Sequence, residues 1–240
     1  MSTDPLEVLR ASTRARVALG RAGDALPTGR LLELRAAHAA ARDAVHTPLD
    51  ADALAARIAD LGVEVLRAAG APRDRGEYLT RPDLGRRLAD GTQLPHGEHD
   101  VALVVADGLS PLAVAEHAAG MLAEILERLE GRRVAPVVVA TQARVALGDE
   151  IAVALGARDV VVLIGERPGM SSVDSLGIYF TYDARRGRRD SERNCLSNIR
   201  PPHGTGYAAA ATTLALLMAE AQRLKLSGVG LKADPALPGA

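Results

Sequence analysis

Residues 101–111 read VALVVADGLSP, and this stretch decides the fold. The five consecutive apolar residues at 101–105 are typical of a strand that is buried on both faces of a sheet. Residues 106–109 predict a turn. Ser110 followed by Pro111 is a favourable helix start, because serine caps the first turn and proline occupies a position that needs no N–H donor. The stretch therefore predicts a strand, a turn and a helix, which is the repeating unit of a parallel sheet.

The same alternation continues along the chain. The helix that begins at Pro111 is expected to run to Glu130 and to stop at Gly131. The elements expected after it are a strand at 136–140, a helix at 149–155, strands at 159–164 and 176–182, and a closing helix at 207–226. Because strands and helices alternate and crossover connections are right-handed, the sequence predicts an α/β fold with a doubly wound, mostly parallel sheet.

The N-terminal third has helical periodicity. A first helix is predicted over 29–45 and a second over 53–69, which Asp50 or Asp52 can cap. Breakers at 70, 72 and 76 then end the pattern. We therefore expect a helical N-terminal region over 1–75, a ligand-binding domain over 76–232 and a frayed Pro/Gly/Ala-rich tail over 233–240.

Composition excludes several classes of protein. The chain has 29 Lys and Arg against 30 Asp and Glu, and five aromatic residues in 240, which argues against a nucleic-acid-binding surface. Its one cysteine excludes an intrachain disulfide and a thiolate zinc cluster, and its six histidines lack a metal-binding pattern, so no metal site is expected. Charges within the first 25 residues and the absence of a long apolar stretch favour a soluble cytoplasmic protein rather than a secreted or membrane protein.

Three loops are candidate ligand sites, because parallel sheets bind ligands at the carboxyl ends of their strands. They are 106–110, 141–148 and 165–175. In the third loop, GERPG at 165–169 combines glycines that permit close approach with a carboxylate and a guanidinium, although a tight loop with a surface ion pair also fits. In the first loop, Asp107 and Ser110 can hold a polar ligand or can simply begin the helix.

No catalytic apparatus is evident in the sequence. Cys195 is best interpreted as a small hydrophobic residue, since a nucleophile needs a base and His203 is the only histidine near it in sequence. The basic run at 185–189 is expected to be a solvated hairpin. A site without a nucleophile and base favours a binding subunit whose chemistry comes from a cofactor or a partner.

Five ordered motifs resemble one family. They are GRAG at 20–23, YLTRPDLGRRL at 78–88, ADGLS at 106–110, GERPG at 165–169 and CLSNI at 195–199. Together they resemble the small subunit of ethanolamine ammonia-lyase, over residues 14–232. The resemblance implies an adenosylcobalamin-dependent lyase that converts ethanolamine to acetaldehyde and ammonia by radical migration and elimination. It also implies a Rossmann-like small subunit that closes over cobalamin bound to a catalytic large subunit, in a hetero-oligomer.

Three cofactor-binding positions carry over from the family. They are Val145, Glu166 and Cys195, although Ala143 stands where the family usually has glycine, which affects the loop of Val145. The resemblance implies that Val145 packs against the corrin, that Glu166 accepts an amide N–H, and that Cys195 packs rather than reacts. It assigns no catalytic residue to this chain.

The sequence leaves other points open. None of the histidines has an aspartate two residues before it, so the cofactor is expected to keep its own base on cobalt. The enzyme is expected in the cytoplasm, free or within a bacterial microcompartment. Tyr179, Phe180 and Tyr182 fit either the core or the cofactor-facing surface. The alternative function is a stand-alone doubly wound domain that binds a nucleotide or another small ligand.

Overall fold

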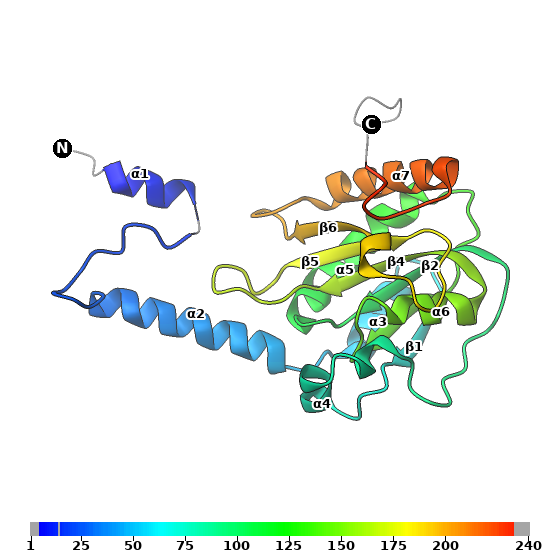
Figure 1. The fold of residues 1–240 in the computed structure, drawn as a ribbon, viewed down its shortest axis with the longest axis horizontal. Helices are drawn as coiled ribbons and strands as arrows, with labels where there is room; N and C mark the ends of the chain where they lie inside the picture. The colour runs from blue at the N-terminus through cyan, green and yellow to red at the C-terminus, as the bar shows by residue number, and fades with distance from the viewer. Residues whose placement is uncertain (1–4, 14, 233–240) are drawn as a thin grey trace.

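The computed structural model describes residues 5–13 and 15–232 and shows an α/β fold built on one mixed sheet (Figure 1). Within these residues the six strands lie in the order β1-β3-β2-β4-β5-β6. The first four of these are mutually parallel, whereas β5 is antiparallel to both of its neighbours. The strands are β1 Val65–Ala69, β2 His99–Ala106, β3 Val137–Thr141, β4 Ala157–Gly165, β5 Leu176–Thr181 and β6 Asn194–Ile199.

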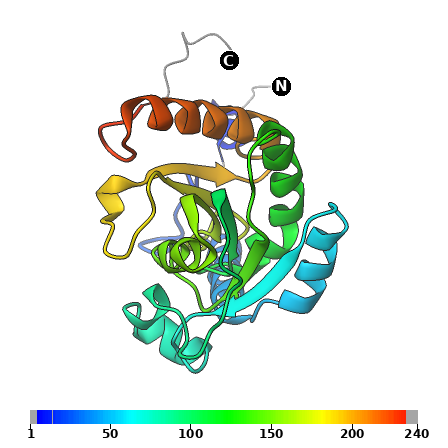
Figure 2. The same cartoon turned by 90° about the vertical axis from the view of Figure 1, so that its right-hand side faces the viewer.

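Helices cover both faces of the sheet (Figure 2). One core cluster joins one face to α3, α5 and α7, and a second joins the other face to α6. Strand β2 contributes alternate residues to each cluster and is buried on both sides, as its unbroken apolar run predicts. The helices are α1 Pro5–Ser12, α2 Thr28–His46, α3 Ala51–Ala59, α4 Arg75–Thr80, α5 Pro111–Arg128, α6 Leu147–Leu155 and α7 Tyr207–Leu224.

The structure confirms the strand–turn–helix unit from which the fold was deduced. Ser110 caps α5, and its Oγ accepts the N–H of Ala113 at 3.2 Å while Pro111 occupies the first turn. The first N-terminal helix and the Asp50 cap of the second are also confirmed, since Asp50 accepts the N–H of Ala53 at 3.0 Å.

The second N-terminal helix is shorter than the sequence predicts. It ends at Ala59, and residues 65–69 form β1, which pairs in parallel with β3. The prediction of helix over 53–69 is therefore wrong in its second half, and the N-terminal stretch 1–75 includes one strand of the sheet. The short stretch VLRAA at 65–69 suits either a helix or a strand, and pairing with the buried β3 decides between them.

The carboxyl-terminal half of the sheet also differs from expectation. Strand β5 runs antiparallel to β4 because the connection over 166–175 contains no helix and is shorter than the roughly dozen residues that a parallel crossover needs. Strand β6 was not predicted, since an exposed edge strand with the sequence NCLSNI has no continuous apolar run. The basic run at 185–189 lies in the connection between β5 and β6, where Arg185, Arg186 and Arg189 are exposed.

Figure 1 shows α1 and α2 extending away from the sheet as an arm. The arm is joined to the β4–β5 connection by Arg16, whose Nη2 donates to the carbonyl of Met170 at 2.9 Å. None of the helices in the described part of the chain combines the length and apolar character needed to cross a bilayer. The tail expected over 233–240 lies outside the described residues.

A buried ion pair joins α6 to the sheet edge. Arg193 donates to both carboxylate oxygens of Asp149 at 2.8 and 2.6 Å, and also to Thr181 Oγ1 at 2.8 Å and the carbonyl of Arg188 at 3.0 Å. The side chains of Asp149 and Arg193 are only 2% and 1% exposed. Each charge is therefore compensated by the other rather than by water.

We expect Asp149→Ala to lower the free energy of unfolding by about 3–5 kcal/mol, because it removes the buried carboxylate that Arg193 contacts most closely and leaves only Asp190, at 3.7 Å, near its charge. Urea denaturation of the purified chain measures the loss. Glu33→Ala is the control, since it breaks an exposed ion pair with Arg30 and should cost no more than about 1 kcal/mol. Equal losses in the two variants would show that the buried pair has no special role.

Candidate functional site

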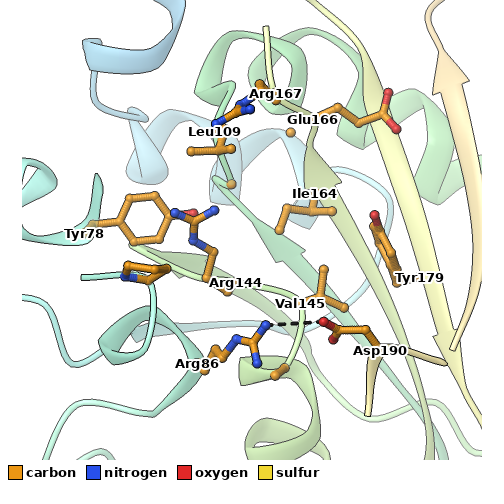
Figure 3. Close-up of a pocket in the computed structure, with 14 residues that line it drawn as sticks. Tyr78, Arg86, Leu109, Arg144, Val145, Ile164, Glu166, Arg167, Tyr179 and Asp190 are labelled. Atoms are coloured by element: carbon orange, nitrogen blue, oxygen red, sulfur yellow. Dashed lines mark hydrogen bonds and ion pairs between the residues drawn. The ribbon is translucent and has the colours of Figure 1, made fainter. Parts of the chain in front are cut away.

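The three candidate loops meet in one pocket of about 460 Å³ at the carboxyl ends of β2, β3 and β4 (Figure 3). The first loop contributes Gly108 and Leu109, the second residues 144–146, and the third residues 165–167. The rest of the lining comes from outside these loops, from Tyr78, Pro82, Arg86, Ile164, Tyr179 and Asp190. The prediction from strand order therefore identified where the pocket lies, but it identified only some of the residues that line it.

Asp107 holds two of these loops together. It is 3% exposed, and its carboxylate accepts the N–H of Gln142 at 2.8 Å and of Ala143 at 2.9 Å. Arg75 Nη1 lies 2.9 Å from the same carboxylate. Of the two interpretations of Asp107, the structure supports an internal role, since its oxygens are engaged by the protein itself.

Gly108 allows the first and third loops to touch. Its φ is +56°, and a Cβ at this position would lie 2.3 Å from the carbonyl oxygen of Gly165. The next residue, Leu109, donates its N–H to that same oxygen at 2.9 Å. A larger residue at 108 would separate the two loops, so the shape of the pocket depends on this glycine.

Tyr78 forms a rigid side of the pocket. Its ring is fully buried and lies between two guanidinium groups, with Arg75 Cζ 4.8 Å and Arg144 Cζ 4.6 Å from the ring centroid. Its hydroxyl donates to the carbonyl of Ala143 at 3.0 Å, and burial raises the pKa of this hydroxyl, which keeps it protonated. Arg144 in turn donates its N–H to the carbonyl of Gly85 at 2.8 Å. The motif at 78–88 thus wraps the second loop, a role that the sequence did not reveal.

Val145 and Glu166 both line the pocket, where Val145 adds apolar surface beside Leu109 and Ile164. Glu166 is half-buried, and its carboxylate accepts hydrogen bonds from Ser175 Oγ at 2.5 Å, Ser197 Oγ at 2.6 Å and the N–H of Asn198 at 3.2 Å. A carboxylate has about four acceptor sites, so one remains for a ligand. Glu166 therefore also joins its loop to β6.

Cys195 lies next to the pocket rather than in its wall. It is an exposed residue of β6 that pairs with Tyr179 of β5, and Tyr179 does line the pocket. Partial desolvation of the sulfur raises the pKa of the thiol, and the negative charge of Glu166 acts in the same direction. A thiol with a raised pKa is a poor nucleophile at neutral pH.

The two aromatic rings of β5, together with Tyr182 directly after it, divide between the two faces of the sheet. Tyr179 faces the pocket, whereas Phe180 and Tyr182 belong to the core cluster on the opposite side. Tyr207 packs against His117 and does not line the pocket. Of the chain's five rings, therefore, only Tyr78 and Tyr179 line this pocket.

Polar groups cross the lower side of the pocket in Figure 3, where Arg86 Nη2 lies 3.3 Å from Asp190 Oδ2. Both side chains are more than half exposed, so this pair contributes little to stability. Arg86, Arg144 and Arg167 give the pocket several donors, and Glu166 gives it an acceptor. This mixture of apolar wall and convergent polar groups suits a large ligand with both kinds of surface.

Comparison with known proteins gives a consistent result. Residues 3–232 match the family model of the ethanolamine ammonia-lyase light chain. An ethanolamine ammonia-lyase small subunit from Rhodococcus erythropolis is 50% identical over 226 residues, which is 93% of this chain and 88% of the relative. Those from Ralstonia nicotianae and Azotobacter vinelandii are 52% and 53% identical, over 99% and 95% of this chain and 92% and 88% of the relatives.

The raised pKa of Cys195 predicts slow alkylation. At pH 8 iodoacetamide should label this single cysteine more slowly than a free cysteine, with a midpoint of the pH–rate curve above the free value of about 8.5. Tyr179→Phe removes a hydroxyl whose interaction with the thiol lowers this pKa, so its midpoint should be higher still. Glu166→Gln removes a negative charge that raises the pKa, so its midpoint should be lower. A wild-type midpoint at or below about 8.5 would contradict the assignment.

Proposed function

The chain belongs to the family of ethanolamine ammonia-lyase light chains, and on this premise we propose that its pocket covers one side of adenosylcobalamin held against the large subunit. The observation that supports the proposal is the convergence of Val145 and Glu166, from separate loops, on one pocket at the carboxyl ends of parallel strands. Cys195 reaches the same region through its contact with Tyr179.

The residues present fit such a cofactor in part. The volume of the pocket, about 460 Å³, falls in the range of roughly 300–1,000 Å³ that is usual for the site of a drug-sized ligand. A pocket of this size is too small to enclose a corrin with its amide side chains and nucleotide loop. Its apolar residues and its donors and acceptors nevertheless match a corrin, which is an apolar disc with an amide fringe. The fit is therefore that of half a site, which requires a partner surface.

Each part of the pocket has a role in this proposal. Val145, Leu109 and Ile164 pack against the corrin, and the last acceptor site of Glu166 takes an amide N–H. Arg144 and Arg86 donate to amide carbonyls. When bound, adenosylcobalamin supplies radical chemistry through homolysis of its cobalt–carbon bond, whereas the residues of this chain bind the cofactor and exclude water. We place the catalytic residues on the large subunit.

Two further expectations belong to the proposal. The parallel arrangement of β1 to β4 with helices on both faces supports assignment to the Rossmann-like, doubly wound type. The cofactor is expected to keep its own base on cobalt, since none of the six histidines has an aspartate two residues before it. The complex is expected to act in the cytoplasm, either free or within a microcompartment.

Co-expression with the large subunit tests the proposed function. The isolated chain should bind cobalamin weakly, whereas the complex should bind it tightly and release ammonia from ethanolamine. The EPR spectrum of that complex should show nitrogen ligation by the cofactor's own base. Tight nucleotide binding by the isolated chain, with no effect of the large subunit, would instead support a stand-alone ligand-binding domain.

Substitution of Glu166 tests its role within the pocket. Glu166→Ala should weaken cobalamin binding to the complex by about 1.5–3 kcal/mol, the usual contribution of a hydrogen bond to a charged group. Ser197→Ala is the matched control, because it removes one hydrogen bond that holds Glu166 but leaves the carboxylate in place. Its effect on affinity should be clearly smaller. Unchanged cobalamin affinity in Glu166→Ala would refute a direct hydrogen bond from the cofactor to Glu166. Equal losses of affinity in Glu166→Ala and Ser197→Ala would show that Glu166 acts by positioning its loop.

A further inference from the structure

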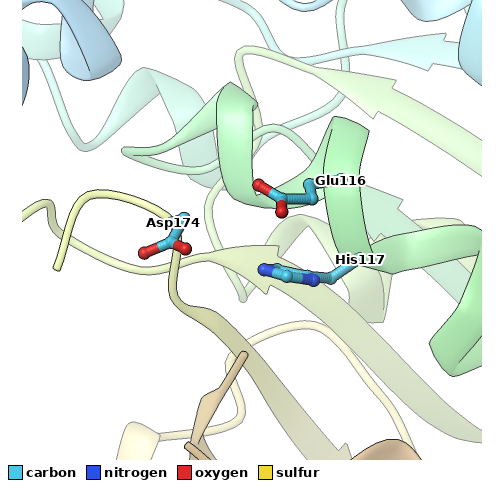
Figure 4. A group of neighbouring side chains, drawn as sticks. All are labelled: Glu116, His117 and Asp174. Carbon is cyan, nitrogen blue, oxygen red and sulfur yellow. The ribbon is translucent and has the colours of Figure 1, made fainter. Parts of the chain in front are cut away.

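Three potential metal ligands gather where α5 lies beside the end of the β4–β5 connection. Glu116 and His117 are adjacent on α5, and Asp174 precedes β5 (Figure 4). One ligand atom from each of the three side chains lies within 4.8 Å of the others. None of the three lines the pocket described above.

His117 is the informative member of this cluster. It is 2% exposed, and its Nδ1 lies 2.8 Å from Tyr207 Oη. Its Nε2 is buried and has no hydrogen-bond partner among the described residues. Figure 4 shows this far end of the imidazole ring pointing toward Asp174, with the Glu116 carboxylate beside it. A buried nitrogen left without a partner costs about 1–3 kcal/mol, so its orientation toward two carboxylates needs a reason.

Tyr207 fixes the orientation of the imidazole. Its ring meets that of His117 edge to face, with centroids 6.0 Å apart, and it packs where α5 has Gly120. A Cβ at 120 would lie 2.8 Å from the tyrosine ring, so the close packing depends on glycine here. When Nδ1–H donates to Tyr207, Nε2 carries the lone pair. This is the arrangement in which a second partner orients a metal-binding histidine.

We propose that Glu116, His117 and Asp174 bind a divalent transition-metal ion, with Zn²⁺ as the best match. An imidazole nitrogen together with carboxylate oxygens is a usual zinc ligand set, whereas Mg²⁺ prefers oxygen ligands and retains its waters. Three protein ligands leave a fourth position for water. The ion would supply the missing partner of Nε2 and balance the two carboxylates.

Such an ion would also attach the β4–β5 connection to α5. Asp174 lies in the same connection as Ser175, which hydrogen-bonds Glu166 at 2.5 Å. Asp174 itself accepts a long hydrogen bond from Ser172 Oγ, at 3.4 Å. The ion would therefore hold the segment next to Glu166 in place. The sequence did not indicate this cluster, because an adjacent Glu–His pair joined by a distant aspartate matches no metal-binding motif.

Zinc binding by the untagged full chain tests the proposal. After removal of metals with a chelator, equilibrium dialysis against ZnCl₂ should show one tightly bound Zn²⁺ per chain. Glu116→Gln and Asp174→Asn should each weaken that binding at least tenfold. Neither substitution disturbs a fully buried side chain, so both variants should remain folded, as circular dichroism can verify.

The control is Glu127→Gln, which changes another exposed carboxylate of α5 and should bind zinc as the wild type does. Binding of Co²⁺ to the wild-type chain should produce the visible bands of a nitrogen- and oxygen-ligated ion, and Asp174→Asn should lose them. Absence of stoichiometric zinc, or equal loss in the Glu127→Gln control, would overturn the proposal.

Discussion

The pocket depends on one buried carboxylate. Asp107 directly follows β2 and accepts the N–H groups of Gln142 and Ala143, which follow β3, while Arg75 compensates its charge. Hydrogen bonds to a charged group contribute about 1.5–3 kcal/mol each, and an unpaired buried carboxylate is strongly destabilising. If the loop after β3 moved away from β2, the Asp107 carboxylate would become exposed to water or would lose its hydrogen-bond donors. Val145 owes its position to that constraint.

The same constraint extends to the motif at 78–88. Arg75 contacts both Asp107 and the ring of Tyr78, and Arg144 covers the other side of that ring. The Tyr78 hydroxyl donates to the carbonyl of Ala143, and the N–H of Ala143 donates to Asp107. These contacts form a closed network in a region of low dielectric, where each interaction supports the next. A segment far from the strand ends in sequence thus becomes part of the wall.

The sequence predicted those features of the fold and site that depend on local pattern. The apolar run of β2, the Ser110 cap and the three loops at strand ends are all properties of short stretches, and the structure confirms them. The direction of β5 and the existence of β1 depend on which strand each segment pairs with, which periodicity does not encode. Tyr78 and Tyr179 acquire their places through tertiary contacts alone. The three cofactor positions themselves rested on the family resemblance.

The incompleteness of the pocket has a thermodynamic consequence for the proposed function. A half site leaves most of a corrin in water, so the cofactor gains its full burial only when a second surface closes over it. Under the proposed function, cofactor and large subunit would bind this chain cooperatively, because each would complete the surface that the other contacts. Linkage makes the coupling reciprocal: the factor by which the large subunit tightens cofactor binding is the factor by which the cofactor tightens the subunit contact. An internal clamp such as that around Glu166 serves this purpose, since a surface already held in shape loses little entropy when it closes.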